Sequence, residues 1–304
     1  QLVFFLNSYF IKKGFHALFL SLLIIINPYF FGTSVFVFTD MLTIMLSLVA
    51  VISFIKDKIT LFVIFSALAI LCRQYVIIIP VAVIIFSLLN YNSKRLKSRN
   101  YIVGSLLTVL PLLLLFAVWK NISPASGIEK WIVPNSSFYN FDYINTYITF
   151  SVIYIFPLVI VFVKKIKLRY SNLIISFMFA AILSFFPIKP SLATLEFTEY
   201  KTVGFVHQVI FEIFGYNSFG LKVILLILLF IGCYINVEVL KRLYIEIKEK
   251  IMDIKILLLL LWILFLLIMP FSYQVWEKYL TMILPFLVLS VYMILFSINN
   301  KSNA

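Results

Sequence analysis

The sequence predicts an all-α fold, a polytopic bundle of about ten transmembrane helices with a partial span at the N-terminus and two long outer loops. Hydrophobic residues make up 63% of the 304 residues and charged residues 12%, whereas soluble domains contain about 45–50% and about 25%. Mean hydropathy is +1.11, and one apolar run follows another along the whole chain. We therefore expect a single integral membrane domain over residues 1–304.

The apolar runs give the order of the expected spans. They lie at roughly 14–28, 40–55, 59–72, 75–89, 101–119, 146–163, 171–187, 220–240, 256–270 and 280–298. Several are shorter than the ~20 residues that a helix needs to cross a bilayer, so we expect oblique or broken helices. Residues 1–11 resemble the end of an earlier span, and the chain begins at Gln1 without a methionine. We interpret it as an N-terminally truncated copy of a longer protein.

Charge predicts the orientation of these spans. Eighteen of the 25 Lys and Arg residues fall in alternate loops that hold five acids, and the remaining loops hold seven bases and seven acids. Cytoplasmic loops of membrane proteins carry the excess of basic residues. The base-rich loops are therefore predicted to be cytoplasmic, and the net charge of +13 reports topology rather than a nucleic-acid partner.

Two long connections are predicted on the outer face, at residues 120–145 and 188–219. The second contains an amphipathic pattern for a short interfacial helix, with the polar His207, Gln208 and Glu212 off the apolar stripe. The stripe consists of Val203, Val206, Ile210, Ile213 and Phe214.

Asp40 and Arg73 are the candidate functional residues with the clearest geometric argument. Span 40–55 runs inward, turns at 56–58 and returns through 59–72, so Asp40 and Arg73 should lie at similar depth on the outer side. Asp40 suits a helix N-cap as well as a substrate site. Arg73 suits snorkelling as well as binding of a phosphate or carboxylate.

The segment 269–289 carries a third candidate cluster, at the outer start of the last span. It contains Glu277, Lys278 and Tyr279 next to Trp276. Such a cluster is typical of an interfacial anchor, and it equally suits a second cation for a phosphate. Cys72 and Cys233 lie in or beside apolar runs and indicate neither a disulfide framework nor a metal site.

Three motifs in this order resemble the GT-C superfamily of polytopic glycosyltransferases, closest to the dolichyl-phosphate-glucose α-1,2-glucosyltransferase family. They are INPYFFGTSVFVFTD, ALAILCRQYVIIIP and MP…EKYLTMILPFLVL. The resemblance covers residues 30–90 and 269–289. It places family positions on Thr39 and Asp40, on Arg73 and Gln74, and on Lys278 and Tyr279, with Lys278 where the family has arginine.

The resemblance implies an inverting hexosyltransferase, with a polyprenyl- or dolichyl-phosphate sugar as donor and a lipid-linked glycan or other extracytoplasmic acceptor. Asp40 and Arg73 would be catalytic, and Thr39, Gln74, Lys278 and Tyr279 would bind substrate. Asp40 would position the acceptor or hold a cation, for which a divalent cation is possible, and the general base would lie upstream of Gln1. The active face would be the ER lumen in a eukaryote or the periplasmic side in a prokaryote.

Two other functions remain open at this point. A transporter or flippase for an amphipathic anion would use the same rim charges, although the sequence shows no internal repeat of the kind that transporters contain. A glycan polymerase or ligase would share the long outer loops.

Overall fold

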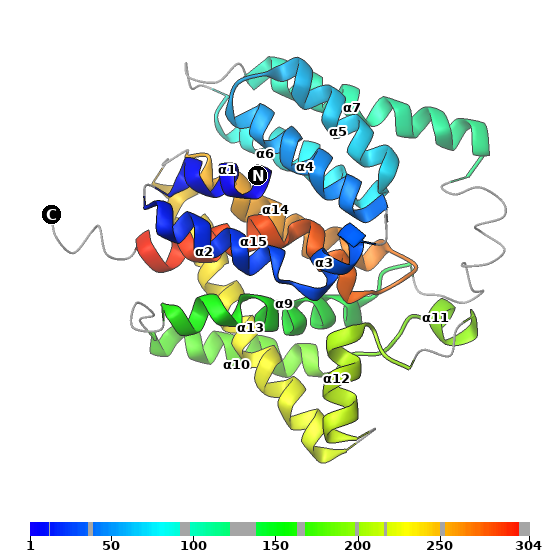
Figure 1. The fold of residues 1–304 in the computed structure, drawn as a ribbon, viewed down its shortest axis with the longest axis vertical. Coiled ribbons are helices and arrows are strands. Elements are labelled where there is room, and N and C mark those ends of the chain that lie inside the picture. Colours follow the sequence, from blue (N-terminus) through cyan, green and yellow to red (C-terminus); the bar gives the residue numbers. More distant parts are fainter. Residues whose placement is uncertain are drawn as a thin grey trace, which may run out of the picture. The chain divides into compact units, whose positions relative to one another are not determined.

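The structure is a computed structural model that describes residues 1–11, 13–35, 39–91, 98–121, 138–162, 168–197, 201–215, 218–249 and 253–297. Every regular element among these residues is a helix (Figure 1), so the predicted all-α class is confirmed. The chain forms two compact units. The first consists of Gln1–Ser123, Leu243–Phe265 and Thr281–Ser290, and the second of Pro124–Arg242, Leu266–Leu280 and Val291–Ala304.

The first unit is built on a helical hairpin. Its helices are α1 (Leu2–Phe10), α2 (Gly14–Ile25), α3 (Pro28–Val35), α4 (Thr39–Ile55), α5 (Ile59–Cys72), η1 (Gln74–Ile77), α6 (Ile78–Leu89) and α7 (Ser98–Trp119), with most of α14 (Lys255–Ile268) and the N-terminal part of α15 (Leu280–Ser297). Helices α4 and α5 pack along each other, and α7 packs on both α5 and α6. Helix α1 packs on α2 and α4.

An aromatic cluster fixes one end of the α4–α5 hairpin. The ring of Phe54 contacts the rings of Phe62, Phe86 and the buried Tyr101, and Phe62 also contacts Tyr101. The closest pair, Phe54 and Tyr101, has centroids 4.7 Å apart. The Tyr101 hydroxyl donates to Asp57 Oδ1 at 3.0 Å. Asp57 occupies the hairpin turn with φ of 54°, a conformation that aspartate adopts more readily than most residues.

The second unit surrounds α9 (Phe141–Val161). It also contains α10 (Tyr170–Ser184), α11 (Leu192–Phe197), α12 (Phe205–Phe214), most of α13 (Phe219–Lys248), and the short turns η3 (Met269–Phe271) and η4 (Glu277–Tyr279). Side-chain amides hold α10 at both ends. Asn145 Nδ2 donates to the carbonyls of Leu183 and Phe186, and Asn172 Nδ2 donates to Glu238 on α13.

A glycine sets the distance between α9 and α13. A Cβ added at Gly232 would lie 2.6 Å from the carbonyl oxygen of Ile148 and 2.7 Å from its Cγ2. Small residues at such positions are typical of helix pairs in membranes, where packing rather than the hydrophobic effect brings helices together.

Each predicted span corresponds to a helix, but not every helix is long enough to cross a membrane. In the described part of the chain, four segments are long and apolar enough to do so, namely Ser98–Trp119, Phe141–Val161, Phe219–Lys248 and Glu277–Ile294. The other apolar helices are 10–17 residues long. The chain is thus an integral membrane protein, and the number of ten spans stays a prediction.

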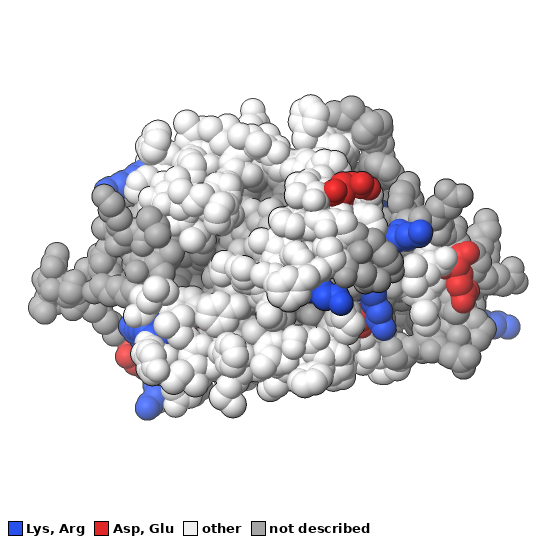
Figure 2. Space-filling view, turned by 90° about the horizontal axis from the view of Figure 1, so that it is seen from below, with Lys and Arg blue, Asp and Glu red and all other residues white. Residues whose placement is uncertain are grey.

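The surface agrees with this assignment. Figure 2 views the molecule from the side on which α12 and α13 lie in Figure 1. In this view, charged side chains lie at the left and across the right half, and the described surface between these two groups is uncharged. Many large apolar side chains are exposed, for example Leu114 on α7 and Phe177 on α10, which are 67% and 68% exposed. Exposure on this scale is expected where lipid replaces water.

Two boundaries differ from the expectation. Helix α9 begins at Phe141, so residues 141–145 are helical rather than part of the outer loop, and residues 122–137 of that loop lie outside the described residues. Helix α13 continues to Lys248, so Lys241 and Arg242 lie on a helix and not in a loop. The apolar pattern ends near residue 240, but a helix continues past its apolar section when polar side chains can point into water.

Helix α12 is present as predicted, but its buried face is different. The predicted polar face included His207, which is only 5% exposed, whereas Ile213 of the predicted apolar stripe is 68% exposed. The exposed apolar side chains instead follow Phe205, Val209 and Ile213 at four-residue spacing. That stripe suits contact with lipid.

Glu277 explains why α12 is turned this way. Its carboxylate is fully buried and accepts the backbone N–H groups of Val206, at 2.9 Å, and of His207, at 2.6 Å. The Tyr154 hydroxyl donates to the same carboxylate at 3.4 Å, and the Glu277 N–H donates to the carbonyl of Val203. A carboxylate at the N-terminus of a helix satisfies amides that have no partner within the helix and interacts favourably with the helix dipole.

We expect Glu277→Ala to release the start of α12. The substitution leaves two buried amides without an acceptor, which costs about 1–3 kcal/mol. Amide hydrogen exchange at Val206 and His207 should accelerate by roughly 5- to 150-fold, the same free energy expressed as a rate. Glu212→Ala is the matched control, because Glu212 lies on the same helix. Its carboxylate accepts an exposed hydrogen bond from the side chain of Gln208 and caps no backbone amide among the described contacts. Equal exchange rates in the two variants would contradict this role of Glu277.

Candidate functional site

The side chains of Asp40 and Arg73 meet in the first unit. Arg73 Nε donates to Asp40 Oδ1 at 2.8 Å. The Asp40 side chain is 5% exposed and that of Arg73 is 30% exposed. The two side chains are therefore in contact, although they are separated by 33 positions in the sequence. Their depth in a membrane stays a prediction.

Local structure explains the placement of both groups. Asp40 lies in the first turn of α4, where a negative charge is stabilised by the helix dipole. Arg73 follows the last residue of α5 in an extended conformation, with φ of −149° and ψ of 114°. The extended residue separates α5 from η1, which begins at Gln74. This break places the guanidinium beside the start of α4.

The pair is asymmetric in its access to ligands. Burying an unpaired carboxylate costs several kcal/mol in a protein interior, so Asp40 depends on its cationic partner. Arg73 keeps part of its surface open while it holds Asp40. A guanidinium in this position is oriented by the carboxylate and can still be approached by an anion.

The other predicted substrate residues of this unit flank the pair. Thr39 is the first residue of α4 and is exposed, and its carbonyl accepts a bond from the Thr43 hydroxyl at 2.8 Å. Gln74 is exposed at the start of η1. Both therefore lie next in sequence to a member of the ion pair with their side chains accessible.

Lys278 and Tyr279 belong to the second unit and are described within it. Lys278 Nζ lies 5.9 Å from the ring centroid of Trp276 and 5.7 Å from that of Tyr279, within range of a cation–π interaction. Tyr279 is buried. These aromatic neighbours fit an interfacial anchor. They do not neutralise the ammonium group of Lys278, which is therefore also compatible with binding an anion.

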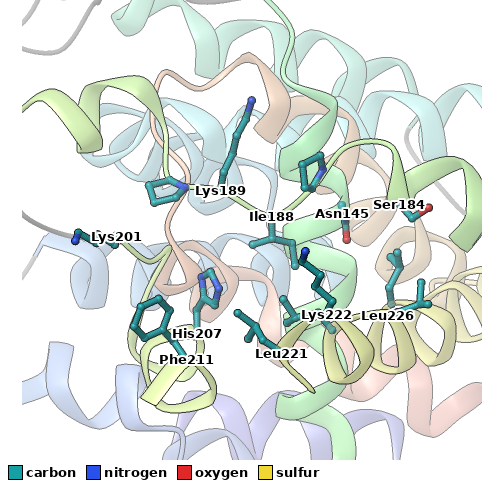
Figure 3. A pocket seen from close by; sticks show the side chains of 14 residues that line it. Asn145, Ser184, Ile188, Lys189, Lys201, His207, Phe211, Leu221, Lys222 and Leu226 are labelled. Carbon is teal, nitrogen blue, oxygen red and sulfur yellow. The ribbon is translucent and has the colours of Figure 1, made fainter. Parts of the chain in front are cut away.

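A cavity in the second unit has no counterpart among the predicted site residues. It measures about 530 Å³ and is lined by Lys189, Lys201 and Lys222 together with His207 and several leucines of α13 (Figure 3). No residue spacing in the sequence indicates this cavity, since the three lysines come from three different segments. Their only common feature in sequence is that they are isolated bases in the loops predicted to face outward.

His207 contributes a neutral donor to this cavity. Burial lowers the pKa of His207 to about 4, so the ring is uncharged at neutral pH. Its Nδ1 accepts the backbone N–H of Val203 at 3.2 Å, which places the proton on Nε2. The Phe150 ring packs against the imidazole with centroids 5.6 Å apart.

Metal ligands do not gather in the described residues. Within the described ranges, no group of three His, Cys, Asp or Glu side chains is arranged to hold a metal ion. His16 lies in α2, and Cys72 and Cys233 are free thiols in α5 and α13.

Comparisons with known proteins found no match for this chain among family models, curated proteins or solved structures. Its function has to be argued from its own residues and geometry.

Proposed function

We propose that the protein is a membrane glycosyltransferase that transfers a sugar from a polyprenyl-phosphate donor to an extracytoplasmic acceptor. The observation that carries the proposal is the ion pair between the buried Asp40 and the partly exposed Arg73. An oriented guanidinium at the end of membrane helices fits a phosphate that is anchored by a lipid chain. The order of the three sequence motifs supports the same class.

In the proposed reaction, an acceptor hydroxyl attacks the anomeric carbon and forms the new glycosidic bond. The bond from that carbon to the phosphate oxygen breaks, and the lipid phosphate leaves with the electron pair. A base takes the proton of the acceptor hydroxyl. Arg73 stabilises the charge that develops on the leaving phosphate, because preorganised donors act most strongly where charge appears in the transition state.

Asp40 has a positioning role in this scheme. Its Oδ1 accepts from Arg73 Nε, which fixes the plane of the guanidinium and directs the outer edge of this group, away from Nε, towards a ligand. Thr39 and Gln74 supply polar side chains beside the phosphate. A phosphate contact from Lys278, which the resemblance implies, stays a prediction. The expectation that Asp40 positions the acceptor or holds a divalent cation is replaced in the proposal by this direct contact with Arg73.

We expect Arg73→Gln to lower sugar transfer by about 100-fold or more, the usual loss when one donor to developing charge is removed. Asp40→Asn keeps the shape and one acceptor oxygen, so it should cost less than Arg73→Gln. The assay follows a labelled sugar from a panel of polyprenyl-phosphate donors into lipid-linked and other glycan acceptors of membranes that contain the protein.

Arg99→Gln is the matched control, because Arg99 is an exposed arginine at the start of α7 and should retain wild-type transfer. Equal levels of inserted protein show that the variants fold. Wild-type transfer rates in both Arg73→Gln and Asp40→Asn would refute the proposal. Movement of the labelled lipid across the bilayer without sugar transfer would favour a flippase.

The proposal also requires the charged ends of the outer loops to face away from the cytoplasm. We expect an impermeant maleimide added from outside to label Lys201→Cys but not Lys58→Cys in a protein whose Cys72 and Cys233 are replaced by serine. Both positions are exposed, so accessibility to the reagent depends on the side of the membrane alone. Labelling of Lys58→Cys alone would reverse the predicted orientation.

A further inference from the structure

We infer that the cavity between α10, α12 and α13 of the second unit is a binding site for an anionic lipid, with the phosphate at the lysines and a hydrocarbon chain along α13. This inference is independent of the proposed sugar transfer, because it concerns other residues and a ligand that carries no sugar. A volume of about 530 Å³ lies within the usual range for ligand sites of about 300–1,000 Å³.

The polar half of the cavity selects for an anion. Lys189 comes from the connection after α10, Lys201 from the segment before α12, and Lys222 from the first turn of α13. In Figure 3, Lys222 extends towards Ile188 and Asn145, whereas Lys189 and Lys201 extend away from the centre of the view. Long lysine side chains at a rim can turn towards a bound phosphate.

The balance of charge in the cavity remains positive. No Asp or Glu of the described residues lines it. Asp142, at the start of α9, interacts electrostatically with Lys189 and offsets part of its charge. Lys201 and Lys222 bring two further positive charges into one cavity, and the repulsion between such charges is relieved when an anion binds.

His207 adds a hydrogen-bond donor to the lysines. With Nδ1 occupied by the Val203 amide, the remaining ring nitrogen carries the proton and can donate to a phosphate oxygen. The Asn145 amide nitrogen is already used by the carbonyls of Leu183 and Phe186. The donors available for an anion are therefore His207 and the three ammonium groups.

The apolar half of the cavity fits a hydrocarbon chain. Leu221, Leu225, Leu226 and Leu229 of α13 and Phe211 of α12 line it. Leu229 is buried, whereas Leu226 is 50% exposed. Leu226 thus belongs both to the cavity and to the outer surface of a helix long enough to span the membrane. A hydrocarbon chain bound along Leu226 would therefore lie next to the apolar outer surface of α13.

The test measures binding of dioctanoyl phosphatidic acid to the full chain purified in a neutral detergent. Dioctanoyl phosphatidylcholine and inorganic phosphate are the comparison ligands. We expect phosphatidic acid to bind at least about tenfold more tightly than either comparison ligand, because phosphatidylcholine has no net charge and inorganic phosphate has no hydrocarbon chain. Inorganic phosphate binding as tightly as phosphatidic acid would overturn the role of the apolar wall.

The variants identify the site. Replacing Lys189, Lys201 and Lys222 together by glutamine should raise the Kd for phosphatidic acid by about tenfold or more. The control variant replaces the exposed Lys13, Lys58 and Lys248 by glutamine, removes the same charge and should keep the wild-type Kd within about twofold. Equal weakening in both variants would show attraction by net charge alone and overturn the inference, as would no weakening in either.

Two single variants test whether weaker binding results from loss of the ligand contacts or from unfolding. Lys222→Gln alone should raise the Kd for phosphatidic acid severalfold, and its melting temperature without lipid should equal that of the wild type. Leu226→Trp narrows the space for the hydrocarbon chain of the lipid. It should weaken binding of phosphatidic acid and leave binding of inorganic phosphate unchanged. A wild-type Kd for phosphatidic acid in both single variants would refute the site.

Discussion

The bond between Arg73 and Asp40 is the constraint on which the candidate site depends. It closes the end of the α4–α5 hairpin that lies opposite the turn at Asp57, where aromatic packing and the Tyr101–Asp57 bond hold the other end. In an apolar chain, a buried carboxylate is stable only with a compensating partner. The same contact that compensates the buried carboxylate of Asp40 also orients the Arg73 guanidinium, so the stability of the hairpin and the proposed binding of a phosphate would have one physical cause.

Polar side chains play a comparable part in the second unit. Asn145 and Asn172 hold α10 to its neighbours, and Glu277 holds the start of α12. Each satisfies groups that would be costly to bury alone. The rotation of α12 that Glu277 sets has a further consequence, because it brings His207 to the lysine-lined cavity and turns Phe205, Val209 and Ile213 outward.

The fold class and the meeting of Asp40 with Arg73 could be predicted from the sequence because both depend on local periodicity and on the length of two consecutive helices. The face of α12 could not, since a contact from Glu277, 70 residues away from His207, outweighs the amphipathic pattern. The cavity could not be predicted from the sequence either, because Lys189, Lys201 and Lys222 are isolated along the chain. Only tertiary packing brings them to one cavity. The role of Gly232 could not be predicted for the same reason, since the residue that leaves no room for a Cβ there, Ile148, lies on another helix.

A double-mutant cycle on Asp40 and Arg73 tests the central claim most directly. The free energy of unfolding is measured for the wild type, Asp40→Asn, Arg73→Gln and the double variant in the same detergent. If the two groups depend on each other as described, the double variant is more stable than the sum of the single losses implies, with a coupling of about 1 kcal/mol or more. Losses that add to within about 0.5 kcal/mol would contradict the account.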